Sequence, residues 1–408
     1  MDEYEASVSA LSREDQLLLC GAPPLLTTEQ VRRLTALLTS SLNWSELLDQ
    51  ADRHAVVPML HRHVCAMSTN ILPEEVKAAL AQRSRAGLVW NLHLRHELIK
   101  LLGLFNEANL PVMPLKGLYL GSLLYDDPLL RPTSDLDLLV QPAHLPAIEQ
   151  MMEKAGWIRL PPEEQGAEYH VSYVMTGGND GTVTVELHID FGEAYVAGLD
   201  IQSVWATASP AQWEGRSIWT MEPSDLLLSL CLHAVKDGLG SLRSLLDITL
   251  FLERFGRDLP WQKLAQRITD DKIGTPIYVT LLHCCELLDA SVPAEFLDAI
   301  RPRRKLSWPC SQALLRWRGG VLHADPAMLT GPVIALQMLL WEDSVRGKLR
   351  HLRRNLFPSA RLRARWTSLS PSSSPVRQYL AWIWEACRHL SHQVAVRSHA
   401  GSTGSPRL

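Results

Sequence analysis

The segments of this chain that read as β-strands are confined to one central stretch. Up to residue 108, apolar residues recur mostly at helical spacing. Between residues 109 and 190, short strand-type runs alternate with helical ones, and beyond Pro223 the helical spacing returns. This distribution predicts an α+β fold in which a strand-containing core is embedded in mostly helical N- and C-terminal regions.

Local signals position the expected elements along the chain. Thr27 to Gln30 and Asn43 to Glu46 are helix start signals, and a long helix is predicted from Pro73 to Glu107. The glycine-rich run at residues 177–181 predicts a turn. The central stretch predicts strands over residues 112–115, 136–140, 157–160, 169–175 and 182–190, and helices over 117–125 and 144–155. Four further helices are predicted over residues 225–234, 241–255, 261–268 and 276–288.

The length of 408 residues allows two or three domains. The changes in pattern predict an N-terminal helical region over residues 1–108, a core over 109–215, a helical domain over 216–343, and a basic helical segment with a flexible tail over 344–408. Residues 368–375 are rich in Ser and Pro, which predicts a loop or linker.

Charge is distributed unevenly along the chain. The net charge is −4, but residues 344–408 hold 12 Lys and Arg and one acid, so this segment carries +11 and the rest −15. Eight of these cations lie within residues 346–365, interleaved with Leu and Phe, which predicts an amphipathic basic helix. Such a helix packs on the acidic body of the same protein, binds a polyanion such as RNA, or lies on an anionic membrane surface.

Composition excludes several classes of protein. With 46% hydrophobic and 21% charged residues, most of the chain can build a globular core rather than remain disordered. The seven cysteines include no C-x-x-C pair, and the N-terminus lacks a signal-peptide pattern, so we expect a reducing, cytoplasmic location. The longest apolar runs, such as residues 332–341, are shorter than the roughly 18 residues that a membrane span requires.

Two of the predicted strands carry acidic residues at alternating positions. Asp135 and Asp137 are two residues apart and project together, while Leu136 and the residues that alternate with it face a core. On the strand over residues 182–190, Glu186 and His188 share the polar face. If the two strands are neighbours, three carboxylates meet and require a cation, for which Mg²⁺ or Mn²⁺ is the suitable ion.

A phosphate-binding element is predicted just before these strands. Gly117 stands at a strand-to-helix junction, where its missing side chain lets backbone N–H groups approach a phosphate. Lys116 and Arg131 add positive charge of the kind that a triphosphate needs. Together with bound metal ions, this arrangement suits in-line phosphoryl transfer.

Each motif also has a purely structural interpretation. A lone D-x-D at a strand start is common, and Glu186 fits the wet face of an antiparallel hairpin. His188 either touches metal or substrate or is structural. Arg243 and Asp247 are four residues apart on a predicted helix, so an intrahelical ion pair is the simplest expectation.

Taken in order, these motifs resemble the nucleotidyltransferase superfamily with the DNA polymerase β-like catalytic fold, and more narrowly the bacterial group of uncharacterised nucleotidyltransferases. The resemblance extends roughly over residues 28–390, with specific motifs only between 111 and 250. The residues that carry it are Leu115-Lys116-Gly117, Tyr125, Arg131, Ser134 to Val140, Glu186-Leu187-His188, Pro223, Asp225 to Leu227, His233 and Leu242 to Ile248.

The resemblance implies a small mixed β-sheet with Asp135 and Asp137 as Mg²⁺ ligands. Glu186 would be the third carboxylate and would help to activate the attacking hydroxyl. The nucleotide and its phosphates would be bound by Lys116, Gly117, Arg131, Ser134 and Arg243, with His233 or Arg243 reaching in from a helical domain. The superfamily has Gly-Ser or Gly-Gly where this chain has Lys116-Gly117, with Gly121-Ser122 one helical turn later, so Lys116 would replace the usual serine contact.

The implied activity is Mg²⁺-dependent transfer of a nucleoside monophosphate from an NTP such as ATP to an acceptor hydroxyl or phosphate, with release of pyrophosphate. The acceptor would be a small molecule, a peptide, a protein or tRNA. Kinase-type phosphoryl transfer from the same site and a non-catalytic nucleotide-binding regulatory module are the alternatives.

Overall fold

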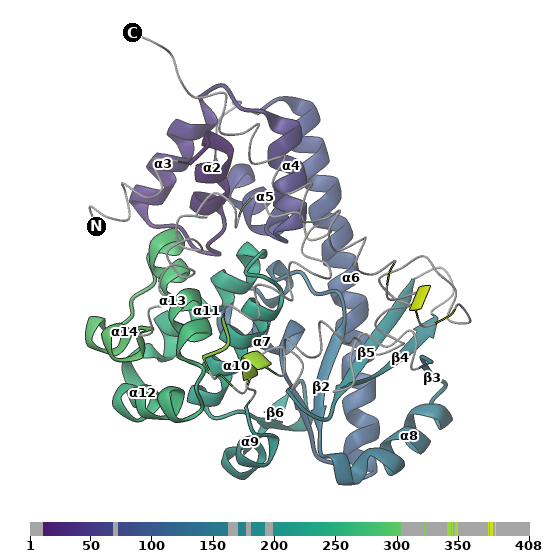
Figure 1. Cartoon of the computed structure of the whole chain (residues 1–408). Coiled ribbons are helices and arrows are strands. Elements are labelled where there is room, and N and C mark those ends of the chain that lie inside the picture. Colours follow the sequence, from purple (N-terminus) through teal and green to yellow (C-terminus); the bar gives the residue numbers. More distant parts are fainter. Residues whose placement is uncertain are drawn as a thin grey trace.

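The computed structural model describes residues 11–67, 72–161, 170–176, 181–191 and 199–302, with isolated positions between 322 and 380. Along the chain, a small sheet falls between an N-terminal group of helices and a second helical group, and in space the two helical groups adjoin each other (Figure 1). The predicted α+β fold is confirmed. Residues 177–180 of the predicted turn and most of the basic segment over 344–408 lie outside the described residues.

The N-terminal group begins where the start signals predict. The side chain of Thr27 accepts a hydrogen bond from the Gln30 amide at 3.2 Å, and Gln30 Oε1 accepts one from the Thr27 amide at 2.8 Å, so a complete capping box starts the second helix of the group. Asn43 caps the third helix, and its side chain accepts a hydrogen bond from the Glu46 amide at 3.3 Å. The four helices are α2 (Arg13–Gly21), α3 (Thr28–Leu38), α4 (Trp44–Arg53) and α5 (Val57–Ala66).

Helix α6 (Glu74–Glu107) joins this group to the sheet, as Figure 1 shows. Near its start, Val76 and Leu80 are buried in one core with α2 to α5. Toward its end, Leu98 and Leu102 are buried in a second core with the strands. One helix of 34 residues therefore takes part in both cores.

The central sheet has five strands in the order β1-β2-β5-β4-β3. Strands β2 and β5 run parallel, whereas the other neighbours are antiparallel, so the sheet is mixed as the resemblance implies. The parallel register places Asp137 opposite Glu186. The strands are β1 (Val112–Pro114), β2 (Leu136–Val140), β3 (Ile158–Arg159), β4 (His170–Thr176) and β5 (Thr182–His188).

The two faces of the sheet pack against different parts of the molecule. Leu136, Leu138 and Val140 of β2 share a core with α6 and with α8 (Leu145–Lys154). Met113 and Leu139, which point the other way, belong to the core of the helical groups. The remaining connections contain α7 (Gly117–Leu124), the 3₁₀ turns η1 (Pro128–Leu130) and η2 (Pro142–His144), and α9 (Ile201–Thr207).

A two-stranded hairpin, formed by β6 (Ser209–Trp213) and β7 (Arg216–Thr220), is absent from the sequence predictions. Its turn residues Glu214 and Gly215 have φ angles of 50° and 71°. Two consecutive positive φ values match the twist of a tight hairpin, and glycine supports them. The hairpin lies against β1 and α6, and the predicted domain boundary between residues 215 and 216 falls at its turn.

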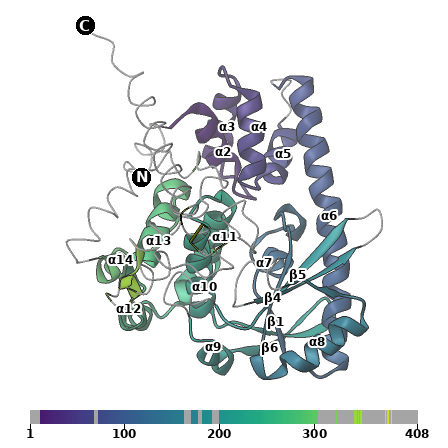
Figure 2. The ribbon, with the colours of Figure 1, turned by 45° about the vertical axis from the view of Figure 1, so that its right-hand side comes forward.

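The second helical group packs on the face of the sheet opposite α6, as Figure 2 shows from the side. The four helices predicted in this region are all present, each within three residues of its expected bounds. They and their neighbours are α10 (Pro223–Lys236), α11 (Leu242–Phe255), η4 (Gly256–Asp258), α12 (Trp261–Asp270), α13 (Gly274–Leu288) and α14 (Ala294–Ile300). Within the described residues, none of the helices combines the length and the apolar character that crossing a bilayer requires.

Candidate active site

Three carboxylates meet on the face of the sheet that looks toward the second helical group. Asp135 directly precedes β2, Asp137 is within it, and Glu186 lies opposite Asp137 on β5. One oxygen from each of the three groups lies within 4.8 Å of the other two. The expectation that these two strands are neighbours is therefore confirmed.

The charges of this cluster are only partly balanced by the protein. Burial and the nearby Asp137 raise the pKa of Asp135. Burial also opposes ionisation of Asp137, but Lys116 and His188 outweigh it and hold the pKa of Asp137 well below its usual range. A set of hard oxygen donors with surplus negative charge is the donor chemistry that Mg²⁺ and Mn²⁺ prefer, so these residues fit such an ion.

Lys116 reaches the cluster because of the way β1 ends. The Leu115 amide donates to the Asp137 carbonyl at 3.0 Å, which continues the pairing of β1 along β2. Lys116 Nζ then lies 3.1 Å from Asp137 Oδ2 and 3.2 Å from His233 Nε2. Burial disfavours the charge on Lys116, but Asp137 and Asp135 raise the pKa of its ammonium group above the usual value. A cation from the protein thus lies against the carboxylates.

Gly117 makes the turn from β1 into α7. Its φ of +64° lies in the left-handed region, and a Cβ atom at this position would lie 3.1 Å from Thr133 Cγ2. The backbone therefore favours glycine here, and the space beside Thr133 is tight for a side chain. Ser122, one turn later, faces away from the carboxylates, because its Oγ accepts a hydrogen bond from Trp213 Nε1 at 2.8 Å.

Two histidines border the carboxylates. His188 Nε2 lies 2.9 Å from Asp137 Oδ1 and 3.5 Å from Glu186 Oε2. His170, which the sequence analysis does not single out, is opposite His188 in the antiparallel register, and its Nε2 lies 3.7 Å from Glu186 Oε1. Burial lowers the pKa of His170 to about 4, whereas the hydrogen bonds of His188 outweigh its burial and raise its pKa.

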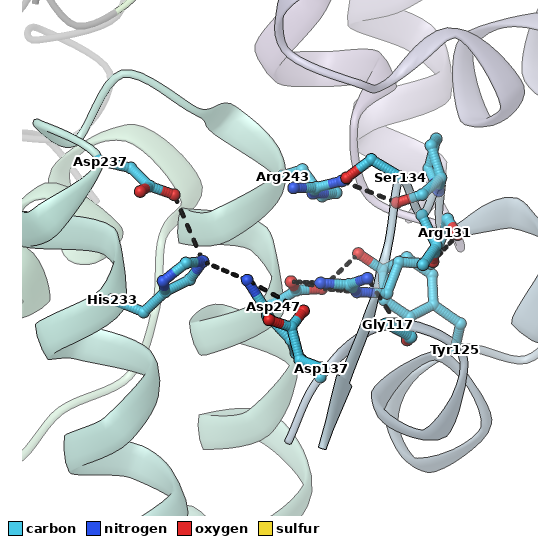
Figure 3. A network of polar contacts seen from close by, with 12 residues as sticks. Gly117, Tyr125, Arg131, Ser134, Asp137, His233, Asp237, Arg243 and Asp247 are labelled. Carbon is cyan, nitrogen blue, oxygen red and sulfur yellow. Dashed lines mark hydrogen bonds and ion pairs between the residues drawn. The ribbon is translucent and has the colours of Figure 1, made fainter. Parts of the chain in front are cut away.

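Arg131 forms a buried ion pair with Asp247, shown in Figure 3. Its Nε donates to Asp247 Oδ1 at 3.0 Å and its NH2 to Oδ2 at 2.8 Å, a two-pronged contact between η1 and α11. Tyr125 also donates to Asp247 Oδ1, at 2.9 Å, and Arg131 NH1 donates to the Gly117 carbonyl at 3.3 Å. Asp247 therefore pairs with Arg131, and the expected intrahelical pair with Arg243 is wrong.

Arg243 instead points across to the strand side of the site (Figure 3). Its NH1 donates a hydrogen bond to the Pro132 carbonyl at 2.7 Å, so the side chain extends toward this carbonyl and not toward Asp247. Its Nε is buried and has no hydrogen-bond partner in the part of the chain that the structure describes. Burial and the neighbouring Arg131 lower the pKa of Arg243, so this guanidinium is held in a position that suits an anion.

These groups line one cavity of about 240 Å³ between the sheet and the second helical group. It brings together all the predicted carboxylates and phosphate-binding residues, whereas His188 is not among the lining residues and contacts Asp137 instead. Ser134 faces the same cavity, and its Oγ donates to Asp135 Oδ1 at 3.0 Å. The lining residues are Lys116, Gly117, Arg131, Thr133, Ser134, Asp135, Asp137, Glu186, His233, Lys236, Asp237 and Arg243.

The sequence analysis does not single out Lys236 and Asp237. Both follow His233 at helical spacing, at the end of α10 and just beyond it. His233 Nε2 lies 3.3 Å from Asp237 Oδ2, and Figure 3 shows this pair approaching the sheet from the helical side. The spacing from His233 was therefore the signal that could have found them.

A mixed sheet that presents clustered carboxylates to a cavity with several cationic side chains is typical of metal-using enzymes that transfer phosphoryl or nucleotidyl groups. Comparison with known families agrees. Residues 40–289 match the family described as uncharacterised nucleotidyltransferase, and the chain belongs to this family. Neither the curated proteins nor the solved structures include a match. The family supports nucleotidyl transfer as the general class of activity.

Proposed function

We propose that this protein transfers a nucleoside monophosphate from an NTP to an acceptor hydroxyl or phosphate and releases pyrophosphate. Asp135, Asp137 and Glu186 would hold Mg²⁺ or Mn²⁺. The observation that carries the proposal is the convergence of these carboxylates on one cavity with Lys116 and Arg243. Bound metal would neutralise phosphate charge and polarise the α-phosphate.

The cations of the cavity suit the phosphate chain. The Arg243 guanidinium is fixed by the Pro132 carbonyl, yet its buried Nε lacks a hydrogen-bond partner among the described residues. An unpaired buried donor is costly, and a phosphate oxygen would satisfy it. Lys116 would turn from Asp137 toward the phosphates when another cation takes its place beside the carboxylate.

Arg131 has a different role in this proposal. Its guanidinium is already committed to Asp247 and to the Gly117 carbonyl. We assign it to holding the Lys116-Gly117 turn in place rather than to direct charge on the phosphates. This changes the function expected for Arg131, although it remains part of the cavity wall.

The reaction needs one proton acceptor and one in-line displacement. The acceptor oxygen forms a bond to the α-phosphorus, the bond from that phosphorus to the bridging oxygen breaks, and pyrophosphate leaves with the electron pair. Glu186 would accept the proton of an attacking hydroxyl, since it would be ionised: burial raises its pKa, but the hydrogen bond from His188 outweighs burial and keeps the pKa below its usual value. The acceptor itself belongs to one of the classes expected from the sequence: a small molecule, a peptide, a protein or tRNA.

Labelled nucleotides test this proposal directly. The purified protein would be incubated with α- or γ-labelled NTPs, Mg²⁺ and a cell extract, beside Asp135→Asn/Asp137→Asn and the exposed control Asp298→Asn on α14. We expect α-label to appear on an extract component. Metal-bound charge stabilisation is worth several kcal/mol, so the double variant should lose about 100-fold or more in rate.

The other outcomes would replace the proposal. Transfer of γ-label without α-label would assign a kinase-type reaction to the same residues. Metal-dependent NTP binding without any transfer would assign a nucleotide-binding module. Equal labelling by the wild type and the Asp135→Asn/Asp137→Asn variant would remove these carboxylates from the reaction.

Arg243→Met provides a separate test of phosphate binding. A charge-assisted hydrogen bond contributes about 1.5–3 kcal/mol, so we expect the dissociation constant for NTP to rise about 10- to 100-fold. Arg254→Met on the same helix is the matched control, because Arg254 donates to the Leu123 carbonyl and is not among the residues that line the cavity. Isothermal titration with a non-hydrolysable NTP measures both. An unchanged dissociation constant for Arg243→Met would exclude its role on the phosphates.

A further inference from the structure

A second group of metal-ligating side chains lies beside the three carboxylates. His170 on β4 and His188 on β5 are opposite each other in the antiparallel register, and Glu186 is two residues before His188 on the same face. One ligand atom from each of the three lies within 4.8 Å of the others. Both histidines are buried, and Glu186 is shared with the carboxylate cluster.

The Glu186 oxygens lie farther from the two imidazoles than the partners of a short hydrogen bond do. Glu186 Oε1 lies 3.7 Å from His170 Nε2, and Glu186 Oε2 lies 3.5 Å from His188 Nε2. Both distances exceed the usual 2.7–3.2 Å of a nitrogen–oxygen hydrogen bond. Two ligands about 2.1 Å from one tetrahedral ion are about 3.4 Å apart, so these gaps match ligands of a shared ion.

The donor set also indicates the kind of ion. Imidazole nitrogen suits zinc and other first-row transition ions, whereas Mg²⁺ prefers oxygen donors and keeps much of its water. Asp135 and Asp137 offer oxygen only, while the neighbouring group offers two nitrogens and one carboxylate. The two halves of the site therefore differ in their metal preference.

We propose that His170, Glu186 and His188 form a binding site for a divalent transition ion of the Zn²⁺ type, next to the carboxylate cluster and sharing Glu186 with it. Binding of the ion releases to solvent the proton that His188 Nε2 shares with Asp137 Oδ1, and the ring keeps its other proton on Nδ1. The site binds metal whether or not the chain transfers nucleotides. The bound ion would link Glu186 to His170 of β4 and so hold Glu186 beside Asp137.

Co²⁺ is the spectroscopic probe for this site. The full chain without a histidine tag would be stripped with a chelator and titrated with Co²⁺ in the presence of excess Mg²⁺, which occupies the oxygen-only positions. We expect one equivalent of Co²⁺ with visible absorption bands of nitrogen coordination, displaced by Zn²⁺ and not by Mg²⁺. His170→Gln should weaken Co²⁺ binding at least about 10-fold. His96→Gln, at an exposed histidine on α6, should leave it unchanged.

The variants also separate this site from the proposed transferase site. His170→Gln should keep Mg²⁺-dependent NTP binding, whereas Asp135→Asn should lose it and keep the Co²⁺ bands. Circular dichroism would verify that each variant folds. If folded His170→Gln binds Co²⁺ as tightly as the wild type, the proposal is wrong, whatever the result with labelled NTPs.

A measurement on the wild type alone removes the dependence on variants. Crystals soaked in Zn²⁺ would be measured at the zinc absorption edge. An anomalous peak within bonding distance of His170, Glu186 and His188 supports the site. A peak confined to Asp135 and Asp137, or no peak at all, overturns it.

Discussion

At the scale of single residues, Lys116 has the most unusual position in the site. Its ammonium group lies 3.1 Å from Asp137, which is 5% exposed, and so balances a buried carboxylate. The same side chain is expected to contact phosphate. Both tasks are compatible because a metal ion can replace Lys116 beside Asp137 and free it for the nucleotide.

Lys116→Met should therefore destabilise the metal-free protein more than the metal-bound one. Without Lys116, Asp137 keeps His188 as its side-chain partner among the described residues, and loss of a charge-assisted bond costs about 1–3 kcal/mol. Mg²⁺ supplies the missing charge. Thermal unfolding in EDTA and in Mg²⁺ should show a larger metal-induced rise in melting temperature for Lys116→Met than for the wild type.

Lys100→Met is the matched control for this measurement. Lys100 pairs with Glu97 on the surface of α6, and its side chain is 58% exposed. Its removal should leave the response to Mg²⁺ unchanged. An equal metal-induced rise for the wild type and for Lys116→Met would show that Lys116 does not stand in for the ion.

His233 makes the stability of the protein depend on pH. Burial and Lys116 lower its pKa to about 4, while Asp237 and Asp137 oppose this and Lys236 adds to it. The unfolded histidine titrates near 6.5, so between about pH 6.5 and 4 the unfolded chain binds a proton that the folded chain excludes. The contribution of His233 to the free energy of unfolding has its full value above pH 6.5 and decreases toward pH 4, by at most about 3 kcal/mol.

Urea unfolding over this pH range measures the contribution of His233. We expect His233→Gln to lose the share of the decrease between about pH 6.5 and 4 that His233 contributes, while His170, whose pKa is also lowered to about 4, continues to act in both proteins. His96→Gln, at an exposed histidine, should keep the decrease. A pH profile of His233→Gln that runs parallel to the wild type would contradict the assignment.

At the scale of elements, the pair between Arg131 and Asp247 connects two segments that are far apart in the sequence. Arg131 follows η1, and Asp247 lies in the middle of α11. The same arginine holds the Gly117 carbonyl, so α11 is linked through it to the start of α7. The glycine turn of the site thus depends on a helix of the second group.

A double-mutant cycle measures this link. Arg131→Met or Asp247→Leu alone leaves the other charge buried and should cost about 3–5 kcal/mol, whereas the double variant should cost less than the sum. The Arg62–Asp126 pair, with side chains 37% and 32% exposed, is the matched control. Its coupling should stay below about 1 kcal/mol. Additive effects at Arg131 and Asp247 would show that the pair is not a link.

The sequence predicts the elements where the controlling interactions are local. The capping box of Thr27 and Gln30 starts α3 as expected, and the alternation around Asp137 gives β2 its correct bounds. The β6–β7 hairpin is not predicted because the largely exposed β6 shows no apolar alternation, although Glu214-Gly215 is a usable turn signal. Helices and strands with clear local capping or alternation signals can therefore be predicted, and those without them cannot.

The sequence predicts the site only where it shows which residues share one face of a strand. Asp135, Asp137 and Glu186 were expected to meet because two strands with polar faces require only that the strands be neighbours. His170 depends on the register of β4 against β5, which no local pattern reveals. Helical spacing predicts that Asp247 pairs with Arg243. In the structure, Arg131, which is distant in the sequence, makes a two-pronged contact with both oxygens of Asp247.

At the scale of the whole molecule, the cavity is built from two cores. Asp137 and Glu186 are held by strands whose other face packs on α6 and α8. His233 and Arg243 come from α10 and α11, which belong to the core of the helical groups. A ligand in the cavity therefore contacts both bodies at once and should stabilise their association.

Hydrogen exchange should show this coupling. A ligand at about 100 times its dissociation constant stabilises the bound state by about 2.7 kcal/mol, which slows exchange that requires its release about 100-fold. With Mg²⁺ and a non-hydrolysable NTP, we expect slower exchange in α7, α10 and α11 as well as in β2 and β5. Helix α3, which lies outside the cavity, should be unchanged. The Asp137→Asn variant should lose the effect, and protection limited to the strands would show that the helical group does not take part in binding.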